Sequence, residues 1–170
     1  PAGAIVATTA LGVRGRDADT GSLALRDGGV AVAAGRSLLE LDGRGAVRAR
    51  ATLDDRAVGA LIDGPEGTLV TGETGAVYVF RPPAPPRKIG TFGGQVRRDG
   101  GAALADPRTL VAVVDGRRLV ALDLSSGAAH VRASVAEGGS PLDGPPAVGP
   151  NGLVYAATQG GMVVGVDAVG

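Results

Sequence analysis

Short runs of alternating apolar and polar residues recur along the chain, and turn residues separate them. In Leu110 to Gly127, LVAVVDGRRLVALDLSSG, two apolar runs flank Asp115-Gly116, and a second turn closes the unit. Period-2 alternation predicts strands, and Asp-Gly between two strands predicts a hairpin. No segment of ten or more residues combines a 3.6-residue period with capping residues. The pattern therefore predicts an all-β fold with very little helix.

The same unit occurs five times, which indicates a repeat architecture. Hairpins are expected near residues 4–21, 29–45, 68–86, 109–127 and 152–170. The equivalent positions after their second strands are Asp17, Asp42, Arg81, Asp123 and Asp167, with separations of 25, 39, 42 and 44 residues. The last three separations match the roughly 40–45 residues of a four-stranded propeller blade. The first is short, so either an outer hairpin is missing there or residues are lost near 21–23.

Second apolar segments lie between the hairpins and supply the other two strands of each blade. They are AVRARATL from Ala46, RKIGTFGG from Arg87 and AHVRASVA from Ala129, followed by VGALIDGPEG, GGAALADPR and DGPPAVGPNG. Residues 1–170 are thus expected to form one β-propeller region of about four blades, as a partial ring or a fragment of a larger ring of seven or eight blades. An open arc exposes strand edges, which favours binding of a protein partner or self-association.

These repeats resemble those of the PQQ-like propeller family. The match is closest in LVAVVDGRRLVALDLSSG and LVYAATQGGMVVGVDAVG, while IVATTALGVRGRDADTG keeps the Asp and the Thr-Gly turn. Family members usually carry Trp shortly after the Gly turn, where this chain has Ala49 and Val131. Quinoprotein dehydrogenases of this type also use a Trp platform, acidic and Asn calcium ligands and often a vicinal disulfide. Because the chain contains no Trp and no Cys, the resemblance implies the non-enzymatic, BamB-type branch, without a cofactor.

The composition indicates a folded chain and argues against two classes of function, nucleic-acid binding and membrane insertion. The 170 residues are 44% apolar and include 30 Gly and 11 Pro, which suits a folded chain with many tight turns. The net charge is zero, with acidic and basic residues interspersed, so no electrostatic footprint for nucleic acid or an anionic membrane is present. No apolar run approaches the roughly 18–20 residues that span a bilayer, so membrane insertion is not expected.

Asp17 and Asp19, in RDADTG, are weak metal-site candidates. Their spacing resembles half of a calcium loop, but the third oxygen ligand, the central Gly and the distal Glu are missing. Other copies have ELDGRG and ALDLSSG at this place, so a turn with an Asx-type hydrogen bond is the favoured interpretation of Asp17.

No catalytic group of residues emerges from the sequence. His130 is the only histidine and is expected on a strand beside a turn, without partners for a metal site or a triad. RPPAPPRK, from Arg81 to Lys88, is expected to be a stiff loop at a blade edge, with a polyproline ligand as the alternative. GETGAVY and GGQVRRDGG are Gly-rich but do not open a helix, so they are not phosphate-binding loops.

The expected function is a non-catalytic scaffold or protein-interaction module of a bacterial envelope or secreted protein. Its location would be periplasmic, outer-membrane-associated or extracellular. Two alternatives stay open: a fragment of a PQQ-dependent dehydrogenase or other propeller enzyme, and an extracytoplasmic sensor domain. Binding is expected at a blade top or in the central funnel, where loops gather.

Overall fold

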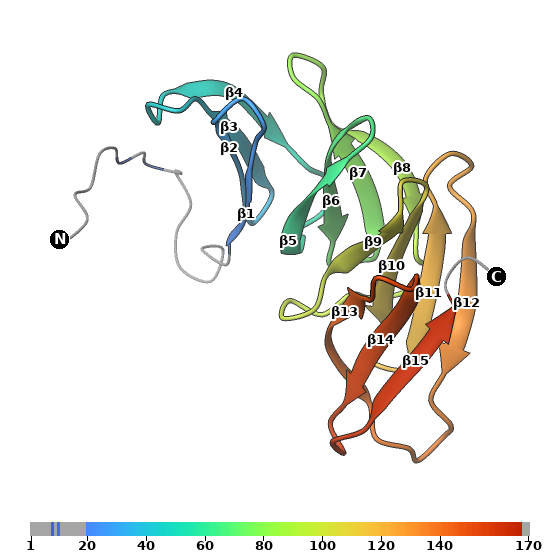
Figure 1. Ribbon diagram of the computed structural model, residues 1–170. Coiled ribbons are helices and arrows are strands. Elements are labelled where there is room, and N and C mark those ends of the chain that lie inside the picture. Colours follow the sequence, from blue (N-terminus) through green and yellow to red (C-terminus); the bar gives the residue numbers. More distant parts are fainter. Residues whose placement is uncertain (1–7, 9, 11–19, 168–170) are drawn as a thin grey trace, which may run out of the picture.

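The described part of the chain consists of β-strands joined by turns and loops (Figure 1). The computed structural model describes Thr8, Ala10 and residues 20–167. The first sheet has β1 (Thr20–Ala24), β2 (Val30–Ala34), β3 (Ser37–Leu41) and β4 (Val47–Thr52). The second has β5 (Ala57–Gly64), β6 (Gly67–Gly72), β7 (Ala76–Phe80) and β8 (Arg87–Thr91). The third has β9 (Ala102–Asp106), β10 (Thr109–Val114), β11 (Arg118–Asp123) and β12 (Ala129–Ser134). The fourth has β13 (Leu142–Val148), β14 (Leu153–Thr158) and β15 (Val163–Asp167).

Each sheet is an antiparallel meander in which sequence neighbours pair, as in a propeller blade. The first three sheets have four strands, and the fourth has three within the described residues. The four sheets follow one another along an open arc (Figure 1). The predicted all-β, blade-based architecture is confirmed, and no helix occurs in residues 20–167.

The predicted hairpins are present wherever the structure describes them. β2–β3, β6–β7, β10–β11 and β14–β15 are antiparallel pairs inside the segments 29–45, 68–86, 109–127 and 152–170. The segment 4–21 lies almost entirely outside the described residues. Its last two residues differ from the expectation, because Thr20 and Gly21 begin β1 and do not form a turn. The short first interval reflects this, since residues 20–29 supply only one strand and its turn.

Apolar side chains fill the spaces between consecutive sheets. In β11, Val120 and Leu122 pack in a cluster with the second sheet, and Leu119 and Ala121 pack in a cluster with the fourth. Side chains alternate between the two faces of a strand, so a strand buried on both faces is apolar along its whole length. This explains the unbroken run LVAL in β11, which a half-buried strand would not have.

Glycines bring the first strands of neighbouring sheets together. β1 packs beside β5, and β5 beside β9. Gly59 has a φ of +66°, and a Cβ added there would lie 2.6 Å from the Cα of Gly101. A Cβ on Gly21 would lie 2.3 Å from the carbonyl oxygen of Gly59. The backbones therefore meet directly, and this contact places Gly21 in a strand despite its turn-like sequence.

The substitution Gly59→Ala tests this contact against Gly144→Ala. Gly144 also lies in the first strand of its sheet, with a φ of +70°, but a Cβ there would meet nothing within 4 Å. Both substitutions strain a left-handed backbone, which costs about 1–2 kcal/mol. Only Gly59→Ala also forces two strands apart, so its loss of unfolding free energy should be about 2 kcal/mol larger in urea titrations. Equal losses would show that the close approach is unimportant.

Candidate functional site

One edge of the stacked sheets carries a continuous loop surface, which we call the loop face. It is formed by the turns between the second and third strands of each sheet and by the connections from one sheet to the next. An open depression of about 830 Å³ crosses the second, third and fourth sheets there. Its lining residues are Glu73, Gln95, Val96, Arg97, Arg98, Asp99, Asp115, Gly116, Pro141 and Gln159.

Backbone hydrogen bonds hold the loop face together at each junction between sheets. In each case a turn of the following sheet donates an N–H to a carbonyl of the connection that leads into that sheet. The pairs are Glu73 to Arg56 at 2.8 Å, Asp115 to Gln95 at 2.8 Å, and Gln159 to Pro141 at 2.9 Å. The Gln95 N–H also donates to Oδ1 of Asp115 at 2.8 Å. The same bond is repeated at three junctions, and each time it ties a turn of the loop face to the connection that leads into its sheet.

The Asp55 carboxylate adds side-chain hydrogen bonds at the junction between the first and second sheets. Its side chain is buried, and Oδ2 accepts hydrogen bonds from the Thr74 N–H at 3.0 Å and from Thr74 Oγ1 at 2.6 Å. Oδ1 accepts one from the Arg56 N–H at 2.7 Å. Through these bonds Asp55 joins the connection at Arg56 to the turn at Thr74.

Charged side chains on the loop face are mutually paired. Arg97 lies 3.0 Å from Asp99 and 3.2 Å from Asp143, and Arg98 lies 3.4 Å from Glu73. These side chains are about half exposed, and such pairs contribute little to stability. They can therefore exchange partners when another protein supplies matching charges, at small energetic cost.

Asp115 is held in the turn between β10 and β11 with a φ of +53°. Desolvation raises the pKa of its carboxyl, but hydrogen bonds from Arg118 and from the Gln95 N–H outweigh it and keep the pKa below the usual value. Asp115 is thus an anion at neutral pH, and its partners fix its position.

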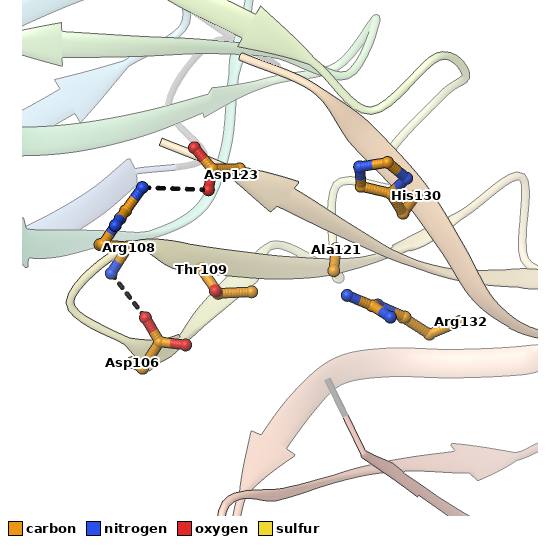
Figure 2. A pocket seen from close by; sticks show the side chains of 7 residues that line it. All are labelled: Asp106, Arg108, Thr109, Ala121, Asp123, His130 and Arg132. Atoms are coloured by element: carbon orange, nitrogen blue, oxygen red, sulfur yellow. Dashed lines mark hydrogen bonds and ion pairs between the residues drawn. The ribbon is translucent and has the colours of Figure 1, made fainter. Parts of the chain in front are cut away.

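A second hollow, of about 470 Å³, lies on the third sheet (Figure 2). It is lined by Asp106, Arg108, Thr109, Ala121, Asp123, His130 and Arg132. Nη2 of Arg108 lies 3.7 Å from Asp123, and the Arg108 N–H donates to Asp106 at 2.7 Å. His130 is exposed on β12, on a strand beside a turn as predicted. The Ser125 hydroxyl donates to Asp123 at 2.5 Å and not to His130, so these three residues do not form a triad.

The same position at the preceding junction explains this hollow. There Leu124 and Ser125 of the third sheet, with Pro107, close over Leu69, Val79 and Ile89 of the second sheet and leave about 270 Å³. Leu124 and Ser125 belong to the turn that leads into a fourth strand. Ala121, which lines the hollow around His130, packs in a cluster with the fourth sheet. We therefore assign this hollow to the junction between the third and fourth sheets.

The Asx-type turn that the sequence predicts at Asp17 lies outside the described residues, but two of the equivalent positions form such turns. Asp123 Oδ1 accepts from the N–H groups of Ser125 at 2.9 Å and Ser126 at 2.8 Å. Asp42 Oδ1 accepts from those of Arg44 at 2.8 Å and Ala46 at 2.9 Å. Hydrogen bonds from the Ser125 hydroxyl and the Ser126 N–H hold the pKa of Asp123 far below its usual value.

The remaining positions singled out by the sequence are the metal-site candidates and the proline-rich segment. Asp17 and Asp19 lie outside the described residues. Among the residues that are described, no group of three or more His, Asp or Glu side chains could hold a metal ion. The proline-rich segment forms the connection from Arg81 to Pro86, and β8 begins at Arg87, so Lys88 belongs to a strand. No helix in residues 20–167 is long and apolar enough to cross a membrane.

The sequence places binding at a blade top, where loops gather, but does not identify the residues of the loop face. The available signal was length, because residues 92–101 form a much longer connection than the other turns and contain QVRRD.

The chain is similar in fold to several solved structures. BamB from Moraxella catarrhalis has 21% identity and a TM-score of 0.65, with 84% of this chain and 47% of that chain covered. The computationally designed Ika4 protein has 15% identity and a TM-score of 0.66, with 94% and 98% covered. The Cps50 (Swd1) β-propeller domain of Myceliophteria thermophila has 11% identity and a TM-score of 0.63, with 84% and 48% covered.

These similarities, together with the stacked four-stranded sheets, show a β-propeller fold. The chain spans about half the length of BamB and of the Cps50 domain. No protein-family model matches the sequence, and no curated protein matches it.

The lock formed by Asp55 predicts a large effect of Asp55→Ala. The substitution leaves three donors without their acceptor in a buried position, which should lower the free energy of unfolding by about 2–3 kcal/mol. Asp99→Ala is the control, because Asp99 is an exposed partner in a surface ion pair and should cost less than about 1 kcal/mol. Chemical denaturation of both variants measures the difference. Similar losses of unfolding free energy in the two variants would show that Asp55 does not stabilise this junction.

The low pKa of Asp123 predicts a pH-dependent contribution to stability. Because the folded-state pKa lies below the unfolded value of about 3.9, the stabilisation is present above pH about 4 and is lost as the pH falls below it. Wild type should therefore be more stable than Asp123→Asn at pH 6, and the two should converge toward pH 2. Thermal unfolding of both proteins across this pH range measures the difference in stability. A difference that stays constant with pH would contradict the stabilising role of ionised Asp123.

Proposed function

We propose that this chain is a non-catalytic β-propeller module that binds another protein through its loop face. The observation that carries the proposal is the depression across three sheets, whose turns are locked by backbone hydrogen bonds and whose charges are paired and half exposed. A fixed polar surface of this kind loses little conformational freedom on binding.

The chemistry of the surface favours a protein as the partner. The lining contains both signs of charge, and neither dominates: Glu73, Asp99 and Asp115 with Arg97 and Arg98. Nucleic acid requires a surplus of positive charge, which neither this face nor the whole chain has. A protein surface of mixed charge can match it, with specificity set by the order of charges.

The fold similarity to BamB and to the Cps50 propeller domain supports a place among propeller proteins. The sequence motifs favour PQQ-like repeats, and with them a bacterial envelope or secreted protein. Dehydrogenase chemistry is the second candidate from the same motifs, and the absence of Trp from the whole sequence is the argument against it. An extracytoplasmic sensor domain is the third candidate.

Site-specific photo-cross-linking tests the proposal. A cross-linking residue at Arg98, on the loop face, should give discrete protein adducts in cells of the source organism. The charge reversals Glu73→Arg and Asp99→Arg, introduced together, should reduce these adducts about tenfold, because they remove the matched charges. The control places the cross-linker at Arg44, in an exposed turn at the opposite edge of the sheets.

Two results would contradict the proposal. One is an adduct pattern that is the same from Arg98 and Arg44 and insensitive to charge reversal. The other is dye-linked alcohol or sugar oxidation by the purified chain after addition of quinone and calcium, which would favour the enzymatic alternative.

A further inference from the structure

The hollow of about 270 Å³ between the second and third sheets lies away from the loop face. Its lining comes from the turns that follow the first and third strands, and these emerge at the opposite edge of the sheets. Among the lining residues, Leu69 and Val79 are buried, whereas Ile89 and Leu124 are half-buried. All four belong to the apolar cluster between the two sheets or pack against it. The hollow is therefore an unfilled end of that core, and it is open to solvent.

Backbone contacts border this hollow. The Leu124 N–H donates to the carbonyl oxygen of Arg108 at 2.7 Å, which joins two turns of the third sheet. A Cβ added to Gly127 would lie 2.5 Å from the carbonyl oxygen of Ile89, so the turn after β11 lies directly against β8. Because that turn is already in backbone contact with the second sheet, it cannot move further toward β8 to fill the hollow.

An open shelf of about 750 Å³ adjoins the hollow. Glu66 and Val79 line both spaces, so the two are continuous. The other residues of the shelf come from the proline-rich connection and the start of β8, and they are Arg81, Ala84, Pro85, Pro86 and Arg87. We call the hollow and the shelf together the basic groove. It combines one deep apolar pocket with a shallow strip lined by prolines and arginines.

The basic groove carries an excess of positive charge. Its ionisable lining residues are Glu66, Arg81, Arg87 and Arg108, in a chain with equal numbers of acidic and basic residues. Arg87 pairs with Glu66 at 2.7 Å, and Arg108 lies 3.7 Å from Asp123. Arg81 is exposed, and its guanidinium has no ion-pair partner within the part of the chain that the structure describes. The groove is therefore complementary to a ligand that is both apolar and acidic.

We propose that the basic groove binds an extended acidic segment of another protein that carries one large apolar side chain. The apolar side chain enters the hollow, which is large enough because an apolar cavity of about 150 Å³ already binds benzene. Acidic residues on either side of it pair with Arg81 and Arg108, and arginine clusters are a recurrent means of recognising acidic segments. An apolar anchor in a pocket supplies most of the affinity in such interfaces.

A peptide fits the basic groove better than a small organic acid does. The shelf is larger than the hollow, and only a chain of several residues can cover the shelf while one side chain fills the hollow. The loop face takes no part in this binding, so the inference does not depend on the function proposed above.

The probe is a fluorescein-labelled peptide in which one phenylalanine is flanked by two acidic residues on each side. Fluorescence anisotropy with the intact chain should show saturable binding. The same peptide with serine in place of phenylalanine, and the same peptide with lysines in place of the acidic residues, should each bind at least about tenfold more weakly. Free 3-phenylpropionate, which has the ring and one carboxylate, should also bind at least about tenfold more weakly because it cannot cover the shelf.

Arg81→Glu should weaken binding of the acidic peptide about tenfold, because it replaces a matching charge with a like charge. Arg44→Glu is the matched control. Arg44 is also an exposed arginine that follows the third strand of its sheet, but it belongs to the first sheet. The control should change binding less than about twofold, and unchanged thermal unfolding shows that both variants fold.

Nuclear Overhauser effects locate the anchor. Contacts from the phenylalanine ring to the methyl groups of Leu69, Val79, Ile89 and Leu124 support the proposal. Absence of saturable binding, ring contacts only with methyl groups elsewhere, equal binding of the phenylalanine and serine peptides, or equal losses in the two variants would overturn it. So would binding of 3-phenylpropionate as tight as that of the peptide, which would indicate a small-molecule site, or a dimer of this chain that excludes the peptide.

Discussion

Burial of both faces of each sheet is the constraint on which this structure depends. Four short strands form a sheet whose two sides are both apolar, and one such sheet cannot remove both sides from water by itself. Stacking against the sheets before and after it does so, with Val120 and Leu122 on one side of β11 and Leu119 and Ala121 on the other. The close backbone contact between Gly59 and Gly101 follows, because the sheets converge at their first strands.

Stacking also produces the surface to which we assign binding. The sheets are meanders of the same hand, so their equivalent turns emerge at the same edge. The bonds from Asp115 to Gln95 and from Gln159 to Pro141 then tie each turn to the connection that leads into its sheet. Since the apolar residues are used for packing between sheets, the loops are free to carry charge without cost to the core. Propeller folds host many functions for this reason, and the function is located in the loops.

The edges of the sheets follow a separate rule. An outermost strand must either be covered or be made unsuitable for pairing. Basic side chains such as Arg50 and Arg87 serve the second purpose and leave the cores undisturbed.

The sequence by itself determined the local structure: strands from period-2 alternation, hairpins from turns such as Asp115-Gly116, and the turn role of Asp123, because these depend on residues close in the chain. It assigned Gly21 to a turn, since turn chemistry and close backbone approach both select glycine. Only the tertiary structure decided that Glu73, Arg98, Asp115 and Gln159 share one surface. Those residues belong to three different sheets, and the packing that joins the sheets is apolar and carries no local sign of which loops it brings together.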